Sequence, residues 1–283
     1  MKILLIGESC TDEYVYGTCD RICSEAPAIC FKSDGHTTQN QGMAANVLSN
    51  LNSLHPSLQV DLITNKSTII KRRFIDTKYN TIVFREDHKD FCDNFVQADF
   101  TDDFFIGYDA IVFSDYCKGF ISEEDIEYIC SQSDPKTPKF IDTKKRLGSF
   151  IKYFDFIKIN EHELENNYPR KMRRDDKSPA SSSFLDSENS TAYDPENIIW
   201  SCKNLIVTRG EKGAMHFSKG SCIPKIYNTL PVAENIKDVC GAGDTFLSAF
   251  VIKYIESKDI PTSISWANEC AGKVVRKFGV TTP

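Results

Sequence analysis

The stretch with the clearest chemical potential is "DVCGAGDTF", residues 238–246, in which glycines stand directly before an acid and an apolar run. Gly241 and Gly243 can adopt positive φ without steric cost and can let a ligand approach the backbone closely. Apolar residues then recur at spacings of three and four, which predicts a helix over residues 245–255. The glycines therefore stand at a helix N-terminus, where the first N–H groups lack intrahelical partners and favour an anion.

Asp244 places a proton acceptor beside this predicted anion site. Phosphoryl transfer to a hydroxyl needs both parts, because amides hold the moving phosphoryl while a carboxylate orients the hydroxyl and takes its proton. An aspartate that caps a helix after a glycine-rich loop would explain the same residues, and the motif alone leaves that alternative open. Rival phosphate motifs are incomplete or missing: Phe246 occupies the third glycine position of G-x-G-x-x-G, and neither G-x-x-x-x-G-K-[ST] nor H-R-D occurs.

Composition limits the class of protein that carries this motif. The chain has 283 residues, 41% hydrophobic and 26% charged, with a formal net charge of −6. This acidic balance argues against nucleic-acid binding, so an anionic ligand depends on local cations. No apolar run approaches the ~20 residues that cross a bilayer, and the opening "KILLIG" is too short for a signal peptide. The eleven cysteines show no C-x-x-C spacing, so we expect reduced thiols in a cytoplasmic protein that binds no membrane.

The elements that must position the motif follow from the apolar pattern. Short apolar runs such as "KILLIG", "QVDLIT" and "NLIVTRG" alternate with helical stretches. They predict an α/β fold with a mostly parallel central sheet, helices on both faces and ligands at the carboxyl ends of the strands. Residues 12–35 and 72–86 alternate like exposed antiparallel strands and are expected to form a small β lid. Residues 165–195 are rich in Ser, Asp and Pro, which predicts a flexible surface insertion within a single domain of residues 1–283.

Over nearly its whole length the sequence resembles the ribokinase-like (PfkB) carbohydrate kinases. "DVCGAGDTF" is similar to the C-terminal signature of that family, and seven internal or closing stretches match its motifs in order: "GMAANVLSNL", "TIIKRRFI", "FSDYCKG", "IDTKK", "KINEHEL", "VTRGEKG" and "ANECAGKVVRKFGVTT". The opening "GESCTDEYVYGTCDRICSEAP" is similar as well. Within the family the likeness is strongest to heptose 7-phosphate kinases. The resemblance implies a ribokinase-like fold with a β lid and Mg²⁺-assisted phosphoryl transfer from ATP to a sugar hydroxyl.

The same resemblance assigns roles to individual residues. It implies that Asp244 is the catalytic base and that the anion hole is formed by the backbone amides of Gly241, Ala242 and Gly243. It implies that the sugar side is formed by Asp12, Gly42 and Asn46. It implies that the nucleotide side is formed by Asn160, Glu163, Thr208, Gly210, Gly213 and Asn268, with Glu163 serving Mg²⁺ directly or through water. Ordinary structural roles, such as loop caps, helix starts and strand-to-strand turns, remain open for each of them.

The choice of substrate depends on cations near the lid. A sugar that already carries a distal phosphate needs partners for a dianion, and the resemblance points to Arg73 with Lys71 and to Lys118. The implied reaction is phosphorylation of the C1 hydroxyl of D-glycero-β-D-manno-heptose 7-phosphate to the 1,7-bisphosphate, a surface-glycan precursor. Another sugar or nucleoside kinase, or a degenerate relative that binds without catalysis, remains an alternative. Lid strands of this family often pair between subunits, so we expect a homodimer.

Three departures from the family pattern put the substrate in more doubt than the reaction. Met43 replaces the second glycine of the sugar-side pair, and positive φ there would strain a methionine. The chain passes from "VDLITN" almost directly to "STIIKRR", where the family has a further helix–strand unit, so we expect the sheet to lack an edge element. The Ser-rich insertion also occupies the place of family helices after the N-x-x-E stretch. In addition, the sequence contains no H-x-G-H nucleotidyltransferase motif, so no fused adenylyltransferase half is expected.

Overall fold

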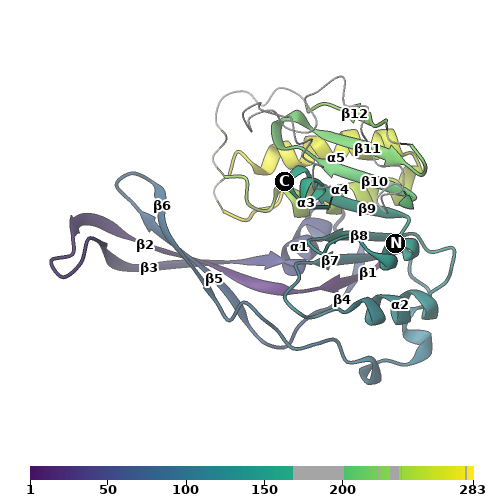
Figure 1. The fold of residues 1–283 in the computed structure, drawn as a ribbon, viewed down its shortest axis with the longest axis horizontal. Coiled ribbons are helices and arrows are strands. Elements are labelled where there is room, and N and C mark those ends of the chain that lie inside the picture. The colour runs from purple at the N-terminus through teal and green to yellow at the C-terminus, as the bar shows by residue number, and fades with distance from the viewer. Residues whose placement is uncertain (168–200, 222, 230–235, 237, 278) are drawn as a thin grey trace, which may run out of the picture.

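In the computed structural model the described residues are 1–167, 201–221, 223–229, 236, 238–277 and 279–283. The insertion expected at residues 165–195 lies outside these ranges, apart from residues 165–167. The described chain forms two sheets and flanking helices (Figure 1). No helix in the described ranges is long and apolar enough to span a membrane.

The larger sheet has eight strands within the described residues, in the order β12-β11-β10-β9-β8-β7-β1-β4. The pairs from β4 to β10 are parallel, whereas β11 runs antiparallel to both β10 and β12. This order confirms the predicted α/β fold with a mostly parallel sheet. The strand bounds are β1 Lys2–Gly7, β4 Gln59–Ile63, β7 Ala110–Asp115, β8 Lys139–Thr143, β9 Phe156–Asn160, β10 Asn204–Thr208, β11 Ala214–Ser218 and β12 Lys225–Tyr227.

Both faces of this sheet are buried, as the continuous apolar runs predicted. In β1 the side chains of Leu4 and Ile6 belong to one core cluster, and those of Ile3 and Leu5 belong to the other. Alternate residues of β1 therefore pack into two different cores, because successive side chains of a strand point to opposite faces of the sheet. The helices α2 (Glu123–Gln132) and α3 (Glu161–Asn167) contribute to the first core, and the second is covered by α1 (Ala44–Leu54), α4 (Ala242–Ser257) and α5 (Ile260–Val274).

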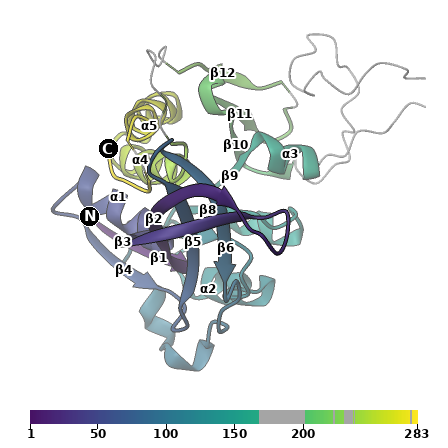
Figure 2. The same cartoon turned by 90° about the vertical axis from the view of Figure 1, so that its left-hand side faces the viewer.

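The smaller sheet has four strands in the order β3-β2-β5-β6 and extends away from the main body (Figures 1 and 2). The segments 12–35 and 72–86 fall largely within these strands, which are longer than the alternation indicated. Asn80, with φ of 51°, lies in the turn between β5 and β6. The bounds are β2 Ser9–Ile22, β3 Ile29–Met43, β5 Ile69–Asp76 and β6 Thr81–His88.

This lid sheet is rooted at the carboxyl end of β1. β2 begins two residues after β1, and β3 runs directly into α1, whose first residue Ala44 donates its N–H to the Glu8 carbonyl at 2.8 Å. The lid root, the end of β1 and the start of α1 therefore meet at the edge where parallel strands bind ligands. The connection that is short relative to the family runs from the end of β4 at Ile63 to the start of lid strand β5 at Ile69. β4 forms one edge of the main sheet.

Candidate active site

The glycine turn takes the predicted position at the start of α4. Gly241 is the N-cap with φ of 80°, and the N–H groups of Gly241, Gly243 and Asp244 have no protein hydrogen-bond partner among the described residues. The Ala242 N–H differs from expectation, because it donates to the Val239 carbonyl at 3.3 Å. Of the three amides predicted to form the anion hole, those of Gly241 and Gly243 are therefore unpaired among the described residues, whereas that of Ala242 is engaged.

The Asp244 carboxylate is buried, with 4% of the residue exposed, and it accepts hydrogen bonds from two directions. Asn46 Nδ2 donates to Oδ2 at 2.8 Å, and the Tyr116 hydroxyl donates to Oδ1 at 2.7 Å. Burial raises the pKa of Asp244 to about 6, while the two hydrogen bonds oppose that rise. A carboxylate with this pKa accepts a proton more readily than an exposed aspartate and is still ionised at neutral pH.

Two adjoining cavities lie beside the glycine turn, and Asp244 lines the smaller of them. The smaller, about 260 Å³, is lined by Asp115, Tyr116, Asp142, Lys144, Lys158, Asn160, Glu163, Val239, Gly241, Gly243 and Asp244. The second, about 290 Å³, is lined mainly by Thr208, Gly210, Glu211, Gly213, Thr229, Phe246, Asn268, Ala271, Gly272 and Val275. Both are lined by Lys158, Asn160, Val239 and Gly243. A ligand that enters the larger cavity can therefore reach Asp244 past the glycine turn.

Lys158 carries the positive charge between these cavities, and the sequence analysis missed it. Its Nζ pairs with Asp142 Oδ2 at 2.5 Å, and both side chains are largely buried. Burial lowers the pKa of Lys158, but the Asp142 carboxylate outweighs that effect and the pKa is raised. A Cβ on Gly243 would lie 3.1 Å from this ammonium, so glycine there gives it room. A lysine within the otherwise apolar run "FIKIN" is the signal that could have found it.

The Asn160 and Glu163 side chains form a reciprocal cap on α3. Glu163 Oε2 accepts from the Asn160 N–H at 2.7 Å, and Asn160 Oδ1 accepts from the Glu163 N–H at 2.8 Å. This is the capping-box arrangement, so the pair has a structural role in addition to lining the smaller cavity. Burial raises the pKa of Glu163, and the nearby Asp142 carboxylate adds to the effect.

The remaining nucleotide-side residues all line the larger cavity. Gly210 and Gly213 have positive φ in the connection between β10 and β11, and a Cβ on Gly213 would lie 2.1 Å from the Tyr227 carbonyl oxygen. Glycine is therefore required there by the neighbouring strand. Thr208 ends β10, and Asn268 on α5 donates to the Tyr227 carbonyl at 3.0 Å.

Asp12 and Arg73 lie at the lid root and form a buried ion pair. Arg73 Nη1 contacts Asp12 Oδ1 at 2.5 Å, and the two side chains are 6% and 5% exposed. The charge of Arg73, a predicted partner of the substrate phosphate, is thus already compensated by Asp12 inside the protein. Gly42 lies beside this pair, and a Cβ there would sit 2.1 Å from Asp12 Oδ2, so glycine lets the carboxylate fit.

The other two predicted phosphate-binding cations differ from each other. Lys118 Nζ pairs with Asp90 Oδ2 at 2.5 Å, so the charge of this predicted phosphate partner is also compensated within the protein. Lys71 is half-buried, and no carboxylate among the described residues lies within ion-pair distance of its ammonium. Its Nζ lies 5.3 Å from the Tyr116 ring centroid, and Lys144 Nζ lies 4.6 Å from the same ring. Lys71 is thus the available cation of the set.

Met43, which replaces the second glycine of the sugar-side pair, has a strained backbone conformation. Its φ is 58° and its ψ is −131°, and the side chain is packed beside Cys10 and Ile69 with 3% of the residue exposed. A side chain in this region costs energy that glycine would avoid. The residue stands immediately before α1, whose third residue is Asn46.

Comparison with known proteins places this site in a family. The description "pfkB family carbohydrate kinase" matches residues 63–283. The chain belongs to the PfkB family of carbohydrate kinases. This confirms the family resemblance and the enzyme class expected from the motifs, a phosphotransferase that uses ATP.

Individual relatives extend the comparison. The bifunctional protein HldE of Marinomonas sp. (strain MWYL1) is 27% identical over 309 residues, covering 99% of this chain and 61% of that protein. The bifunctional protein HldE of Helicobacter pylori (strain J99 / ATCC 700824) is 28% identical over 312 residues, covering 98% and 63%. This PfkB chain therefore spans less than two thirds of the length of these relatives.

Solved structures of the family share the fold. The ribokinase of Thermotoga maritima superposes with a TM-score of 0.70 at 15% identity, covering 98% of this chain and 94% of that one. Phosphofructokinase-2 of Escherichia coli superposes with a TM-score of 0.70 at 14% identity, covering 99% and 94%. At these identities the likeness establishes the ribokinase-like architecture.

Proposed function

We propose that this PfkB kinase transfers the γ-phosphoryl group of ATP to the C1 hydroxyl of D-glycero-β-D-manno-heptose 7-phosphate. The observation that carries the proposal of catalysis is the position of Asp244, which is buried, lines the smaller cavity and directly follows Gly243, which has an unpaired amide and lines both cavities. The choice of sugar is supported by motifs shared with heptose 7-phosphate kinases and by the similarity to proteins named HldE.

In the proposed reaction ATP occupies the larger cavity with its phosphates directed toward the glycine turn. The unpaired N–H groups of Gly241 and Gly243 and the Lys158 ammonium stabilise negative charge on the transferred group. Asp244 orients the sugar hydroxyl and accepts its proton as the oxygen bonds to phosphorus. Because the transition state of phosphoryl transfer is loose, the base need not be strong, and a pKa of about 6 suits this role.

Magnesium fits this site as a companion of the nucleotide phosphates. No group of three or more His, Cys, Asp or Glu side chains in the described ranges could hold a metal by protein ligands alone. Mg²⁺ that is bound by phosphates keeps several waters and needs only one or two carboxylates nearby. Glu163 lines the smaller cavity and is the residue that we propose to hold the ion, directly or through water. When bound, the ion neutralises charge on the phosphates.

Lys71 is the residue we propose for the distal phosphate of the sugar. Arg73 is neutralised by Asp12, whereas Lys71 lies beside the same carboxylate without an ion-pair partner in the described chain. Burial lowers the pKa of Lys71, so a phosphate dianion that binds there would restore the favourable environment of the ammonium. The Asp12 carboxylate, held by Arg73, remains the proposed ligand of sugar hydroxyls.

The lid presents an apolar surface that we propose is covered by a second copy of the chain. Phe31, Phe74 and Phe84 form a row on this sheet, with ring centroids 5.2 and 5.6 Å apart, and Phe84 is 60% exposed. Ile22, Ile29 and Ile82 on the same sheet are also exposed. Exposed apolar side chains on a projecting sheet favour pairing between subunits, so a homodimer through the lid is the proposed assembly.

Sugar specificity is tested by measuring ADP release with heptose 7-phosphate, fructose 6-phosphate, ribose and adenosine. The proposal predicts that heptose 7-phosphate gives the highest kcat/KM. Preference for another acceptor would retain the kinase and overturn the choice of sugar. ATP binding without phosphoryl transfer to any acceptor would instead identify a degenerate binding protein.

A further inference from the structure

Tyr116 is the one donor to the Asp244 carboxylate for which neither the sequence motifs nor the proposed reaction supplies a role. It follows β7, lines the smaller cavity, and donates its hydroxyl to Asp244 Oδ1 at 2.7 Å. The pKa of Tyr116 is raised well above its ordinary value by burial and by the Asp244 charge. The phenol therefore stays protonated and acts as a donor across the range in which Asp244 titrates.

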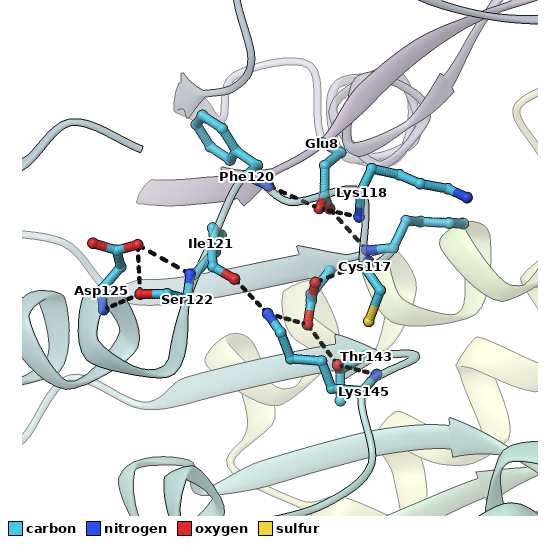
Figure 3. A network of polar contacts seen from close by, with 11 residues as sticks. Glu8, Cys117, Lys118, Phe120, Ile121, Ser122, Asp125, Thr143 and Lys145 are labelled. Carbon is cyan, nitrogen blue, oxygen red and sulfur yellow. Dashed lines mark hydrogen bonds and ion pairs between the residues drawn. The ribbon is translucent and has the colours of Figure 1, made fainter. Parts of the chain in front are cut away.

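The loop that carries Tyr116 is fixed by a buried carboxylate (Figure 3). Glu8 has no exposed surface, and its Oε2 accepts from the Tyr116 N–H at 2.8 Å. Its Oε1 accepts from the N–H groups of Lys118 at 2.8 Å and Phe120 at 3.4 Å. No cation among the described residues lies within ion-pair distance of Glu8, so backbone amides satisfy this charge. The position of the loop is thus tied to a residue at the end of β1.

A second carboxylate holds the same loop from the other side. Asp115 Oδ1 accepts from the Cys117 N–H at 3.0 Å, and Asp115 Oδ2 is held by Thr143 Oγ1 at 2.6 Å and by Lys145 Nζ at 3.0 Å. Cys117 has φ of 57°, which shows that the turn after Tyr116 is held in a conformation that a cysteine seldom adopts. A strained backbone that several surrounding contacts hold in place is common at functional sites.

We propose that Tyr116 is a positioning residue for the base and that Glu8 is the residue that places Tyr116. The inference rests on the proposed role of Asp244. Asn46 holds one carboxylate oxygen from α1 and Tyr116 holds the other from the loop, so the carboxylate plane is fixed from both sides. Each carboxylate oxygen can accept more than one hydrogen bond, so the acceptor capacity that Asn46 and Tyr116 leave unused is available to a hydroxyl in the cavity. A base held in this way meets the hydroxyl in a productive geometry.

The direction of the pH effect follows from the groups that face Asp244. Asp142 on β8 raises its pKa, Lys158 on β9 lowers it, and Cys10 on β2 is a neutral thiol nearby. The hydrogen bond from Tyr116 favours the ionised carboxylate and therefore also lowers the pKa. Removing the hydroxyl raises the pKa of Asp244, so the acid limb of the kcat profile moves to higher pH.

The test compares Tyr116→Phe with Tyr108→Phe. Tyr108 is a matched control, because its hydroxyl also donates to an aspartate, Asp61 Oδ2 at 2.9 Å, outside the cavities at Asp244. Tyr116→Phe is expected to lower kcat on the order of 10- to 100-fold, with an unchanged KM for ATP and an acid limb at higher pH. The Tyr108 variant should leave kcat and the acid limb unchanged. A Tyr116→Phe enzyme with the wild-type acid limb would overturn the inference, whatever its kcat.

Two further measurements distinguish a positioning role of Tyr116 from a wrong choice of sugar and from a misfolded variant. Glu8→Gln replaces one acceptor oxygen by a donor, so it should loosen the loop and move the acid limb in the same direction. The pKa of the Asp244 carboxyl is also measured by ¹³C NMR without any sugar. A higher pKa in Tyr116→Phe supports the inference even if heptose 7-phosphate is not the acceptor, and an unchanged pKa overturns it even if that sugar is phosphorylated.

Discussion

Asn46 and Asp244 are 198 positions apart in the sequence and meet through a hydrogen bond of 2.8 Å between the first turns of α1 and α4. The amide is oriented from behind, since Asn50 Nδ2 donates to Asn46 Oδ1 at 3.0 Å. Thr245, the neighbour of Asp244, in turn donates its hydroxyl to Asn50 Oδ1 at 2.8 Å. With its oxygen occupied as an acceptor, Asn46 presents its NH₂ group to the carboxylate.

Asn46→Ala should therefore change the pH dependence of the kinase. In the wild type, kcat is expected to fall as pH drops through about 6, where Asp244 becomes protonated. Loss of the Asn46 donor raises the pKa of Asp244 further and moves the acid limb to higher pH. Ser49→Ala on the same helix is the control, because the Ser49 hydroxyl donates to the Ala45 carbonyl at 2.9 Å and has no contact with Asp244, so its loss should leave the profile unchanged. Coincident wild-type and Asn46→Ala limbs would contradict this account.

The strain at Met43 is measurable by comparing two variants. Met43→Ala and Met43→Gly both remove a buried side chain, at a cost of about 2–5 kcal/mol. Only glycine relieves the positive φ of 58°, so Met43→Gly should be more stable than Met43→Ala by about 1 kcal/mol. The free energy of unfolding in urea gives the difference. If the alanine variant is the more stable of the two, the backbone at this position is not strained.

Lys71 and Arg73 should respond differently to replacement by methionine. Arg73→Met leaves the buried Asp12 carboxylate unpaired, so it should lower the free energy of unfolding by about 3–5 kcal/mol. Lys71→Met breaks no ion pair in the described chain, so it should preserve stability and raise the KM for the sugar phosphate but not for ATP. Urea unfolding and steady-state kinetics measure the two effects. An unchanged sugar KM in Lys71→Met would exclude Lys71 as the phosphate partner.

The lid surface should control the assembly of the protein. We expect a mass in solution of twice the 32.0 kDa of one chain, because we propose that a second lid covers the aromatic row that ends at the exposed Phe84. Phe84→Glu should reduce that mass to 32.0 kDa. Phe91→Glu is the control, since Phe91 is equally apolar and 82% exposed but lies beyond β6. Light scattering distinguishes these outcomes, and a monomeric wild type would rule out the dimer.

The fold followed from the sequence wherever local pattern decides structure. The side chains of the continuous apolar run in β1 pack into two cores. The apolar run itself had predicted a sheet that is covered on both faces. The helix that follows the glycine turn also results from local rules about glycine and helix termini, although α4 begins at Ala242 and not at the predicted residue 245. The lid strands were recognised from alternation, although their lengths depend on pairing between β2 and β3, which no short window reveals.

Side-chain partnerships were the part that sequence could not provide. The motifs pointed to Arg73 and Lys118 as phosphate partners but gave no indication of which carboxylate lies opposite each cation, and in the structure each is paired with an aspartate. Tyr116 was present within the quoted motif "FSDYCKG", yet its role depends on a contact with Asp244 across 128 positions. Such contacts are set by topology, since the loop after β7 and the start of α4 meet at one edge of the sheet.

The most direct test of the account is the turnover of Asp244→Asn with ATP and heptose 7-phosphate. The variant preserves the size of the side chain but cannot accept the proton of the sugar hydroxyl. We predict that kcat falls on the order of 10²–10⁴-fold while ATP still binds, because the amides and Lys158 remain in place. Wild-type turnover by Asp244→Asn would contradict the assignment of this residue as the base.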